Sequence, residues 1–424
     1  MADRLTAWRY AFLTTNPPEQ GVVDGVTRWL VVTRAGVLPM TLTSGLIAVL
    51  LAATVGGPAD GPVDWLNITL AVLGIVVAHL ANNLMNDLAD TRVGADTADY
   101  PRALYAPHPI LSGLVTKRQM LIGIAACQVV DLAIMLTLVA RRDWWIVAFA
   151  LGGLFLSWAY TAPPLRLKRI GLGELDVLLT WGPLMVGGVY YAGVGALPWQ
   201  VIAAATVYAL LPTSVLMGKH IDKLPYDARS GTRTLPVLLG EGRAKALTQG
   251  MIIGYYAGVG ALVALRALPW PALLTILALP LLVRTLRAFA RPKPDEPPAD
   301  NPVWPLWWAP LAFLHTRRAG GLLILGLLAW AVYAAVRWGG PVGGVPPARR
   351  APCLDRGLRC VRAVQLRIRT ANGDRLTDGR SLLCLPIRNG PCPPPAKITI
   401  RTANTQPDCV IAAGIAILNG PRAR

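Results

Sequence analysis

Charged residues are scarce in this chain. Asp, Glu, Lys and Arg make up 15% of its 424 residues, while 54% are hydrophobic and the mean hydropathy is +0.47. Soluble domains normally carry about a quarter charged residues. The composition therefore argues against a soluble protein and indicates one that is embedded in a membrane.

Several familiar motifs are also missing. The sequence has no P-loop, GxGxxG, HExxH or GxSxG pattern, which argues against a nucleotide-dependent enzyme. Five of the six cysteines lie after residue 352, and none of them forms a CxxC pair. A zinc site is therefore not expected.

Long apolar blocks are what the sequence has instead. Each is close to the roughly 20 residues that a helix needs to cross a bilayer. We find nine, at about 36–57, 65–85, 119–140, 144–161, 175–196, 199–218, 248–266, 270–290 and 320–338. Only helices and closed barrels satisfy their backbone groups in lipid, and these blocks are too long for barrel strands. The predicted fold class is all-α, a polytopic membrane helical bundle of about nine transmembrane helices.

The two ends of the chain differ from this bundle. Residues 1–35 contain short amphipathic stretches and are predicted to form an interfacial lead-in segment before the transmembrane domain at 36–338. Residues 339–424 are rich in Arg, Pro and Gly and repeat the sequence Ile-Arg-Thr-Ala-Asn at 368–372 and 400–404. Too few apolar residues are present there to bury a core, so we expect an irregular, poorly structured C-terminal extension.

The net charge of +18 is distributed unevenly. The tail supplies thirteen Arg and one Lys against four Asp, and most other cations follow the second, fourth, sixth and eighth blocks. The positive-inside rule then places these loops and the N-terminus in the cytoplasm, as expected of a multi-pass protein of the cell (plasma) membrane. The basic balance thus reflects topology, and the expected partner is the lipid bilayer, with no nucleic acid.

An acidic cluster ends the second block. Asn83, Asn86, Asp87 and Asp90 are spaced so that they share one face of a helix, and Asp96 follows after a glycine. Ionisable groups are costly near a membrane, and neighbouring carboxylates repel each other. A divalent cation removes both problems, and Mg²⁺ prefers one or two carboxylates together with phosphate oxygens and water. The cluster therefore predicts a site for a magnesium–diphosphate complex.

Two further polar segments follow blocks on the same predicted side. Asp222 and Asp227 end the sixth block, with Lys223 between them as a cation that can neutralise phosphate. Tyr160, Arg166 and Lys168 lie at the end of the fourth block, where prolines stop the helix. For Arg166 and Lys168, simple positive-inside anchoring is an equal alternative to catalysis.

Together these three segments resemble the UbiA superfamily of intramembrane prenyltransferases. The first family motif, NDxxD with a later Asp, matches Asn86, Asp87, Asp90 and Asp96. The second acidic motif and its GxxTLxVxxG continuation match Asp222 and Asp227, followed by Gly231, Thr234, Leu235, Val237 and Gly240. The YTxxP and GLGE sequences at 160–174 most resemble the dihydroxynaphthoate branch of the menaquinone pathway.

Two features depart from the family pattern. The second motif usually has three residues between its aspartates, whereas four separate Asp222 from Asp227. An Arg-Pro-Leu element common after the first motif reads His108-Pro109-Ile110-Leu111 here, and Arg102 is the candidate to supply the missing cation.

The resemblance implies Mg²⁺-dependent transfer of a prenyl group from a prenyl diphosphate to an aromatic small molecule. The implied metal ligands are Asp87, Asp90, Asp96, Asp222 and Asp227. The implied diphosphate contacts are Asn83, Asn86, Arg102, Arg166, Lys168 and Lys223, and the Tyr160 ring would steady the allylic cation. The acceptor stays open: dihydroxynaphthoate, hydroxybenzoate, a tetrapyrrole or another phenolic would use the same metal site.

Two other classes were weighed. A secondary transporter would carry its carboxylates near the middle of the membrane on broken, repeated helices, whereas these lie at helix ends on one predicted side. A non-catalytic membrane protein is the alternative if the longer second motif has cost the chain its activity.

Overall fold

A computed structural model describes residues 2–18, 23–55, 62–92, 107–298 and 303–338, with three strands in the tail. Only the backbone is described for residues 2, 3, 90, 92 and 338 and for those strands. The chain divides into two compact units, Met1–Val345 and Pro346–Arg424, and each is considered by itself.

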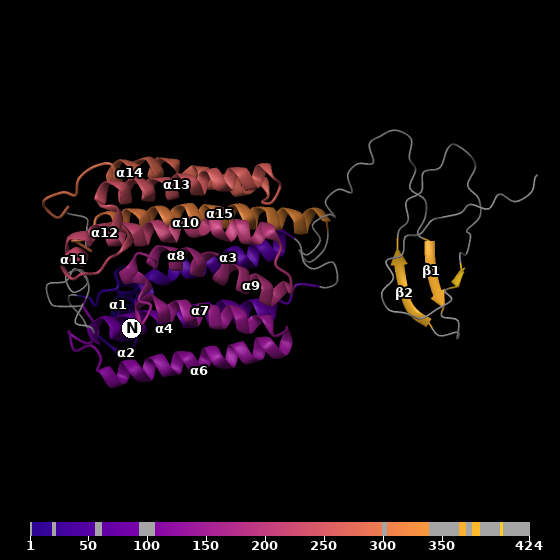
Figure 1. The fold of residues 1–424 in the computed structure, drawn as a ribbon, viewed down its shortest axis with the longest axis horizontal. Coiled ribbons are helices and arrows are strands. Elements are labelled where there is room, and N and C mark those ends of the chain that lie inside the picture. Colours follow the sequence, from indigo (N-terminus) through magenta and orange to yellow (C-terminus); the bar gives the residue numbers. More distant parts are fainter. Residues whose placement is uncertain are drawn as a thin grey trace, which may run out of the picture. The chain divides into compact units, whose positions relative to one another are not determined.

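The first unit is a bundle of long helices (Figure 1). In chain order these are η1 (Ala35–Val37) with α3 (Leu38–Thr54), α4 (Trp65–Arg92), α6 (Lys117–Arg141), α7 (Trp145–Thr161), α8 (Gly173–Leu179) with η3 (Thr180–Leu184) and α9 (Met185–Val194), α10 (Trp199–Asp222), α13 (Glu241–Ala264), η4 (Trp270–Ala278) with α14 (Leu279–Phe289), and α15 (Trp308–Trp338).

Each predicted block coincides with one of these helices. Within the described residues, eight are long and apolar enough to cross a membrane, and α7 is a shorter apolar helix. The predicted all-α membrane bundle is confirmed. Two boundaries differ in a way that matters for the site. Helix α4 continues to Arg92, which keeps Asp87 and Asp90 on the helix, and α15 begins at Trp308 rather than near residue 320.

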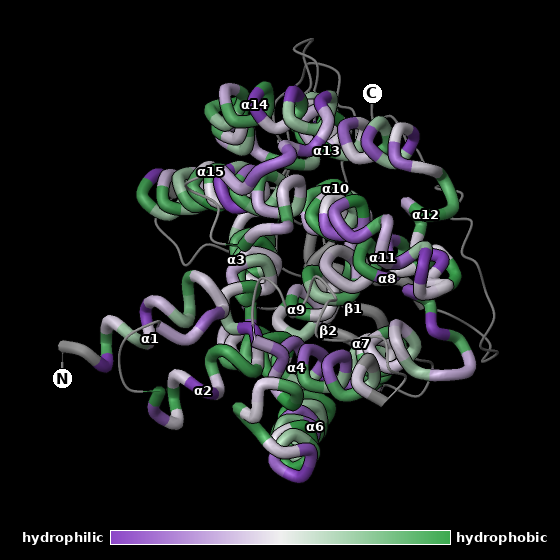
Figure 2. The backbone as a smooth tube through the Cα atoms, turned by 90° about the vertical axis from the view of Figure 1, so that its left-hand side faces the viewer, coloured by the Kyte–Doolittle hydropathy of each residue, from purple (hydrophilic) through white to green (hydrophobic). Residues whose placement is uncertain are grey.

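Short helices gather at one end of the bundle. Helices α1 (Ala2–Thr14) and α2 (Gly25–Val32) occupy the predicted lead-in segment, and α11 (Leu224–Arg229) and α12 (Leu235–Leu239) follow α10. Figure 2 looks along the bundle from this end and shows hydrophilic residues on the turns near the viewer. Helices α4, α7, α10 and α14 end here and α3, α6, α13 and α15 begin here, so segments distant in sequence meet at this end.

Apolar packing around α10 forms the core. Helix α10 contacts α8, α13 and α15, and the buried side chains there include Tyr190, Tyr208 and Tyr255. Buried hydroxyls need partners. Tyr208 donates to the backbone oxygen of Met40 at 3.1 Å, and Tyr255 lies 2.9 Å from the hydroxyl of Thr275. These contacts tie α3 to α10 and α13 to η4.

Helix α6 shows the opposite pattern. Large apolar side chains along it are exposed, among them Ile122 and Val129 at 58% and 66%. A contiguous apolar surface of this kind is unfavourable in water and favourable in contact with lipid. The exposed face of α6 is therefore the outer, lipid-facing surface of a multi-pass membrane protein.

The tail contains strands β1 (Val364–Arg369), β2 (Arg375–Ser381) and β3 (Thr399–Arg401). They form one sheet in the order β2-β1-β3, with β1 antiparallel to β2 and parallel to β3. The parallel pairing sets Ile368 opposite Ile400 and Arg369 opposite Arg401. The first two residues of the two copies of the sequence repeat are thus paired in register with each other.

The close approach of α15 and η4 gives a stability prediction. A methyl group at Gly326 would lie 2.1 Å from the carbonyl oxygen of Pro271, so Gly326→Ala must push backbone away from backbone. Overpacking of this kind costs about 1–3 kcal/mol. We expect a lower thermal unfolding temperature for the detergent-purified variant, measured by intrinsic tryptophan fluorescence.

Gly321→Ala on the same helix is the matched control, because nothing lies within 4 Å of its added methyl group. Equal unfolding temperatures for the two variants would show that the α15–η4 contact is not tight.

Candidate active site

A cavity of about 1120 Å³ opens at the end of the bundle where the short helices gather. Its apolar wall includes Met40, Val283 and Phe313, from α3, α14 and α15. Its basic lining residues are Arg34, Lys168, Lys219, Lys223, Arg284, Arg287, Arg291 and Arg317. Asp176 is the one carboxylate among the described residues that line it. The cavity therefore suits a molecule with an anionic head and an apolar body.

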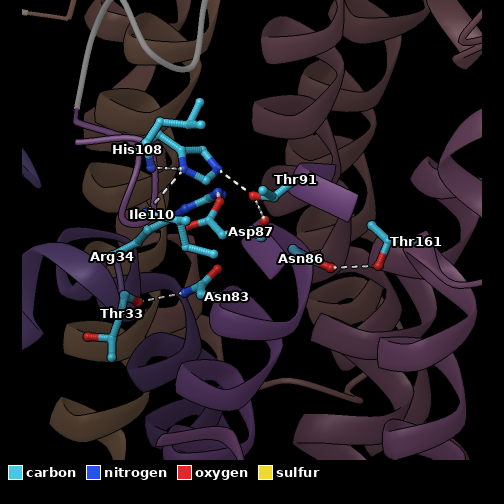
Figure 3. Close-up of polar contacts among 10 residues, drawn as sticks. Thr33, Arg34, Asn83, Asn86, Asp87, Thr91, His108, Ile110 and Thr161 are labelled. Atoms are coloured by element: carbon cyan, nitrogen blue, oxygen red, sulfur yellow. Dashed lines mark hydrogen bonds and ion pairs between the residues drawn. The ribbon is translucent and has the colours of Figure 1, made fainter. Parts of the chain in front are cut away.

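The C-terminal end of α4 borders this cavity through Asn83 and Asn86 (Figure 3). The amide nitrogen of Asn83 donates to the backbone oxygen of Thr33 at 2.9 Å. The amide oxygen of Asn86 accepts a hydrogen bond from the hydroxyl of Thr161, at 3.2 Å. Both predicted polar residues thus lie at the cavity, and they join α4 to the lead-in segment and to α7.

Asp87 is fully buried and forms an ion pair with Arg34 (Figure 3). Burial of a carboxylate is costly unless a cation or hydrogen bonds compensate it, and the Arg34 guanidinium does so here. Arg34 adopts a left-handed backbone conformation, with φ of 54°, immediately before η1. No local sequence pattern points to Arg34, because it lies fifty-three positions before Asp87.

His108 stands where many family members have the arginine of the Arg-Pro-Leu element, and its ring makes structural contacts. The imidazole is buried, with Nε2 at 3.3 Å from the hydroxyl of Thr91, and Nδ1 accepts from the amide nitrogen of Ile110 at 3.3 Å. Thr91 in turn donates to the backbone oxygen of Asp87 at 2.7 Å. His108 therefore holds its loop against the end of α4 (Figure 3).

Asp222 makes contacts that the sequence did not predict. Its carboxylate accepts hydrogen bonds from the backbone amides of Trp307, Trp308 and Ala309, at 2.9, 3.2 and 2.9 Å. These amides form the first turn of α15, where N–H groups lack partners within the helix. Asp222 is thus a helix-capping residue, both of its oxygens are engaged, and it is not among the residues that line the cavity. The geometry gives no support to the metal-ligand role predicted for it.

Lys223, the next residue, does line the cavity. Its ammonium nitrogen lies 3.8 Å from an oxygen of Asp227, and both side chains are buried, with 4% and 0% exposed. Four positions separate these two residues, which is the separation that the family motif gives to its two aspartates. An ammonium group therefore stands where that spacing would place a carboxylate.

The third predicted segment is only partly at the cavity. Tyr160 and Lys168 line it, as does His220, whose Nδ1 lies 2.7 Å from an oxygen of buried Glu174. Arg166 does not line the cavity, and its buried Nε has no hydrogen-bond partner within the part of the chain that the structure describes. The structure thus brings Tyr160 and Lys168 to the site and leaves Arg166 outside it.

A row of arginines on α14 and α15 was not expected at the site. Arg284, Arg287 and Arg291 recur at intervals of three and four, so they continue one helix face into the following turn. Arg317 joins them from α15. The spacing was visible in the sequence, but the early start of α15, which brings these helices to the cavity, was not.

The described residues place candidate oxygen ligands for a metal ion at the end of α4. Among them, no group of three or more His, Cys, Asp or Glu side chains has a metal-binding arrangement. At the end of α4, Asn83 and Asn86 line the cavity, whereas Asp87, paired with Arg34, is not among its lining residues. The side-chain oxygens of these three residues are of the kind that Mg²⁺ takes alongside phosphate. The side chain of Asp90 is not described, though its backbone continues α4 by one turn, and Asp96 and Arg102 lie outside the described residues.

A helical bundle with these polar loops matches a known family. The model of the UbiA prenyltransferase family matches residues 42–309. The chain belongs to this family. It is therefore a transferase enzyme and a multi-pass membrane protein, which decides against the transporter alternative.

Curated relatives agree with the family at modest identity. The chain is 29% identical to 1,4-dihydroxy-2-naphthoate octaprenyltransferase of Escherichia coli, over 65% of this chain and 88% of that protein. It is 29% identical to the enzyme of the same name from Mycobacterium tuberculosis, over 59% and 83%. It is 24% identical to 2-carboxy-1,4-naphthoquinone phytyltransferase of Synechocystis, over 60% and 80%.

A solved structure shares the fold. The apo structure of a UbiA homologue from Aeropyrum pernix superposes with a TM-score of 0.52 at 17% identity, covering 68% of this chain and 97% of that one. At this identity the likeness concerns the fold alone.

The capping role of Asp222 leads to a prediction that separates it from metal binding. Asp222→Ala removes the acceptor of three amides at the start of α15, and loss of a helix cap costs about 0.5–2 kcal/mol. We expect a lower thermal unfolding temperature in EDTA and an equal decrease in Mg²⁺. Asp222→Asn, which keeps one acceptor oxygen, should lose less. A decrease that appears only in Mg²⁺ would instead identify Asp222 as a metal ligand.

Proposed function

We propose that this enzyme transfers a polyprenyl group from its diphosphate to an aromatic acceptor, with 1,4-dihydroxy-2-naphthoate as the favoured candidate. The observation that carries the proposal is the cavity, which combines a basic rim with an apolar wall in one space. A prenyl diphosphate has the same two-part character. The acceptor rests on the names of the relatives and on the YTxxP and GLGE sequences, and another phenolic acceptor is the alternative.

The chain's own residues would bind and orient the donor. Asp87, together with Asn83 and Asn86, would hold Mg²⁺ on the diphosphate from the α4 side, and Asp90 would add a carboxylate one turn later. When bound, the metal ion would neutralise part of the charge that develops on the diphosphate. The Arg34 ion pair keeps Asp87 in place, because it fixes the carboxylate against the lead-in segment.

Basic residues opposite α4 would stabilise the leaving group. Lys168 and Lys223 line the cavity, and fixed cations favour the charge of the departing diphosphate. The carbon–oxygen bond breaks with its electron pair on the diphosphate, an aromatic carbon of the acceptor bonds to the allylic carbon, and the acceptor loses a proton. Tyr160 lies in the cavity wall, from which its ring can stabilise the allylic cation.

The orientation in the membrane follows from the basic loops. We propose that the end carrying the cavity faces the cytoplasm of a cell with this protein in its plasma membrane, because the positive-inside rule favours that side for its Lys and Arg. The donor's chain would then enter from the lipid side along the apolar wall.

A prenyl-transfer assay tests the function directly. Detergent-purified protein is given labelled prenyl diphosphate, a panel of aromatic acceptors, and either MgCl₂ or EDTA. We expect Mg²⁺-dependent product, and Asp87→Asn should lower its rate roughly a hundredfold or more, in line with loss of a charged transition-state contact. Asp143→Asn, a carboxylate at the opposite end of the bundle, is the control and should keep the activity. Folded protein that neither binds nor converts any prenyl diphosphate would sink the proposal.

The apolar wall gives a prediction on chain length. Val283 lines the cavity and is 43% exposed, so Val283→Trp would fill cavity space without overpacking the core. We expect a raised KM for geranylgeranyl diphosphate and little change for dimethylallyl diphosphate. Leu279→Trp, one turn earlier on α14 and 39% exposed but not among the cavity's lining residues, should alter neither. Equal effects on short and long donors would show that the chain does not follow this wall.

A further inference from the structure

We infer that Lys223 provides a built-in positive charge on the α10 side of the cavity, so that this enzyme binds its diphosphate with a metal ion on the α4 side only. The inference rests on the proposed function, since it takes a prenyl diphosphate as the ligand. It concerns which groups of this chain neutralise that ligand.

The first step is the register of the second motif. Gly231 lies four positions after Asp227, and Lys223 lies four positions before it. In both cases three residues intervene, which is the spacing that the family motif has between its two aspartates. Counted back from Asp227, that spacing falls on Lys223 and not on Asp222. Asp222 lies one position earlier, which on a helix rotates a side chain by about 100°. The motif is therefore changed in chemistry, from carboxylate to ammonium, rather than merely lengthened.

The second step is that Asp222 is committed elsewhere. Its two oxygens accept from three amides of the α15 terminus. Turning the carboxylate toward the cavity would leave those amides without their acceptor in a buried region, which carries a large penalty. Asp222 is thus not in a position to replace the carboxylate that the motif lacks.

The third step is the charge around Asp227. This buried carboxylate already has the Lys223 ammonium at 3.8 Å. A divalent cation placed on Asp227 would face the ammonium as well as the carboxylate. Electrostatic repulsion between the two cations disfavours that arrangement. The same repulsion acts at Asp87, which pairs with Arg34. There, however, the sequence adds Asp90 and the amide oxygens of Asn83 and Asn86 as candidate ligands, whereas Asp227 has no second carboxylate at the motif's spacing.

The fourth step is that the cavity needs no second metal ion to attract an anion. Eight Lys and Arg side chains line it against the single described carboxylate of Asp176. Lysine acts as a compact point charge and arginine as a planar donor, and both recognise phosphate. Lys223 is the cation among them that occupies the position of the missing acidic group.

Metal stoichiometry tests this inference without relying on turnover. The detergent-purified full chain is saturated with geranyl diphosphate and titrated with Mn²⁺, and bound Mn²⁺ is counted from the loss of the free-ion paramagnetic resonance signal. We expect one bound Mn²⁺ per protein–diphosphate complex. Lys223→Asp should raise the number to two, because it restores a carboxylate with the motif's spacing.

Binding in the absence of metal gives an independent measurement. Wild-type protein should retain measurable affinity for labelled geranyl diphosphate in EDTA, and Lys223→Met should weaken that affinity at least tenfold while weakening it less in Mn²⁺. Lys245→Met is the matched control, since Lys245 contacts Glu241 and the Trp308 ring and does not line the cavity. Thermal unfolding of each variant establishes that it is folded.

The possible outcomes distinguish a failure of the Lys223 role from a failure of the proposed function. Two Mn²⁺ ions bound to the wild-type complex, or unchanged metal-free affinity in Lys223→Met, would overturn the role of Lys223 and leave prenyl diphosphate binding intact. Absence of geranyl diphosphate binding under every condition would overturn the proposed function, and the inference with it.

Discussion

Neutralising ionisable groups at the end of an apolar bundle is the constraint on which the rest of this structure depends. Carboxylates and ammonium groups are costly where water is scarce, so most of them are paired or hydrogen-bonded. Asp176 is the exception at this end, because it is buried and its Oδ1 has no hydrogen-bond partner among the described residues, whereas four other buried acidic groups have partners. Asp87 pairs with Arg34, Glu174 with His220, Asp227 with Lys223, and Asp222 with backbone amides.

These pairings also connect the helices. The Arg34–Asp87 pair ties the lead-in segment to α4, the Glu174–His220 pair ties α8 to α10, and the Asp222 cap ties α10 to α15. The surface around the cavity is thus held by contacts between segments distant in sequence. Catalytic groups need such support, because a charged site works only when its groups are already oriented toward the reacting atoms.

Charge is unevenly distributed around the cavity. A site that holds metal ions on both sides would instead need acidic ligands on both walls. Oxygen donors suited to Mg²⁺ lie at the end of α4, whereas the α10, α14 and α15 walls present Lys and Arg. Lys293 adds to the positive charge near Asp222, although partial burial lowers the pKa of its ammonium group. The proposed binding mode follows from this difference, with a metal ion held at the end of α4 and the anion in direct contact with Lys and Arg side chains.

The sequence by itself determined the membrane bundle, because apolar blocks of spanning length allow few other structures in lipid. It also located Asn83, Asn86 and Asp87 on one helix face, since that depends on local spacing alone. The roles of Asp222 and Arg34 were decided only by the tertiary structure. The capping amides lie about 85 residues from Asp222, and Arg34 lies 53 residues from Asp87, so no local pattern links them. Likewise, the sequence alone indicated only that the second motif is one residue longer. The amides at the start of α15 show that the carboxylate of Asp222 is already engaged there.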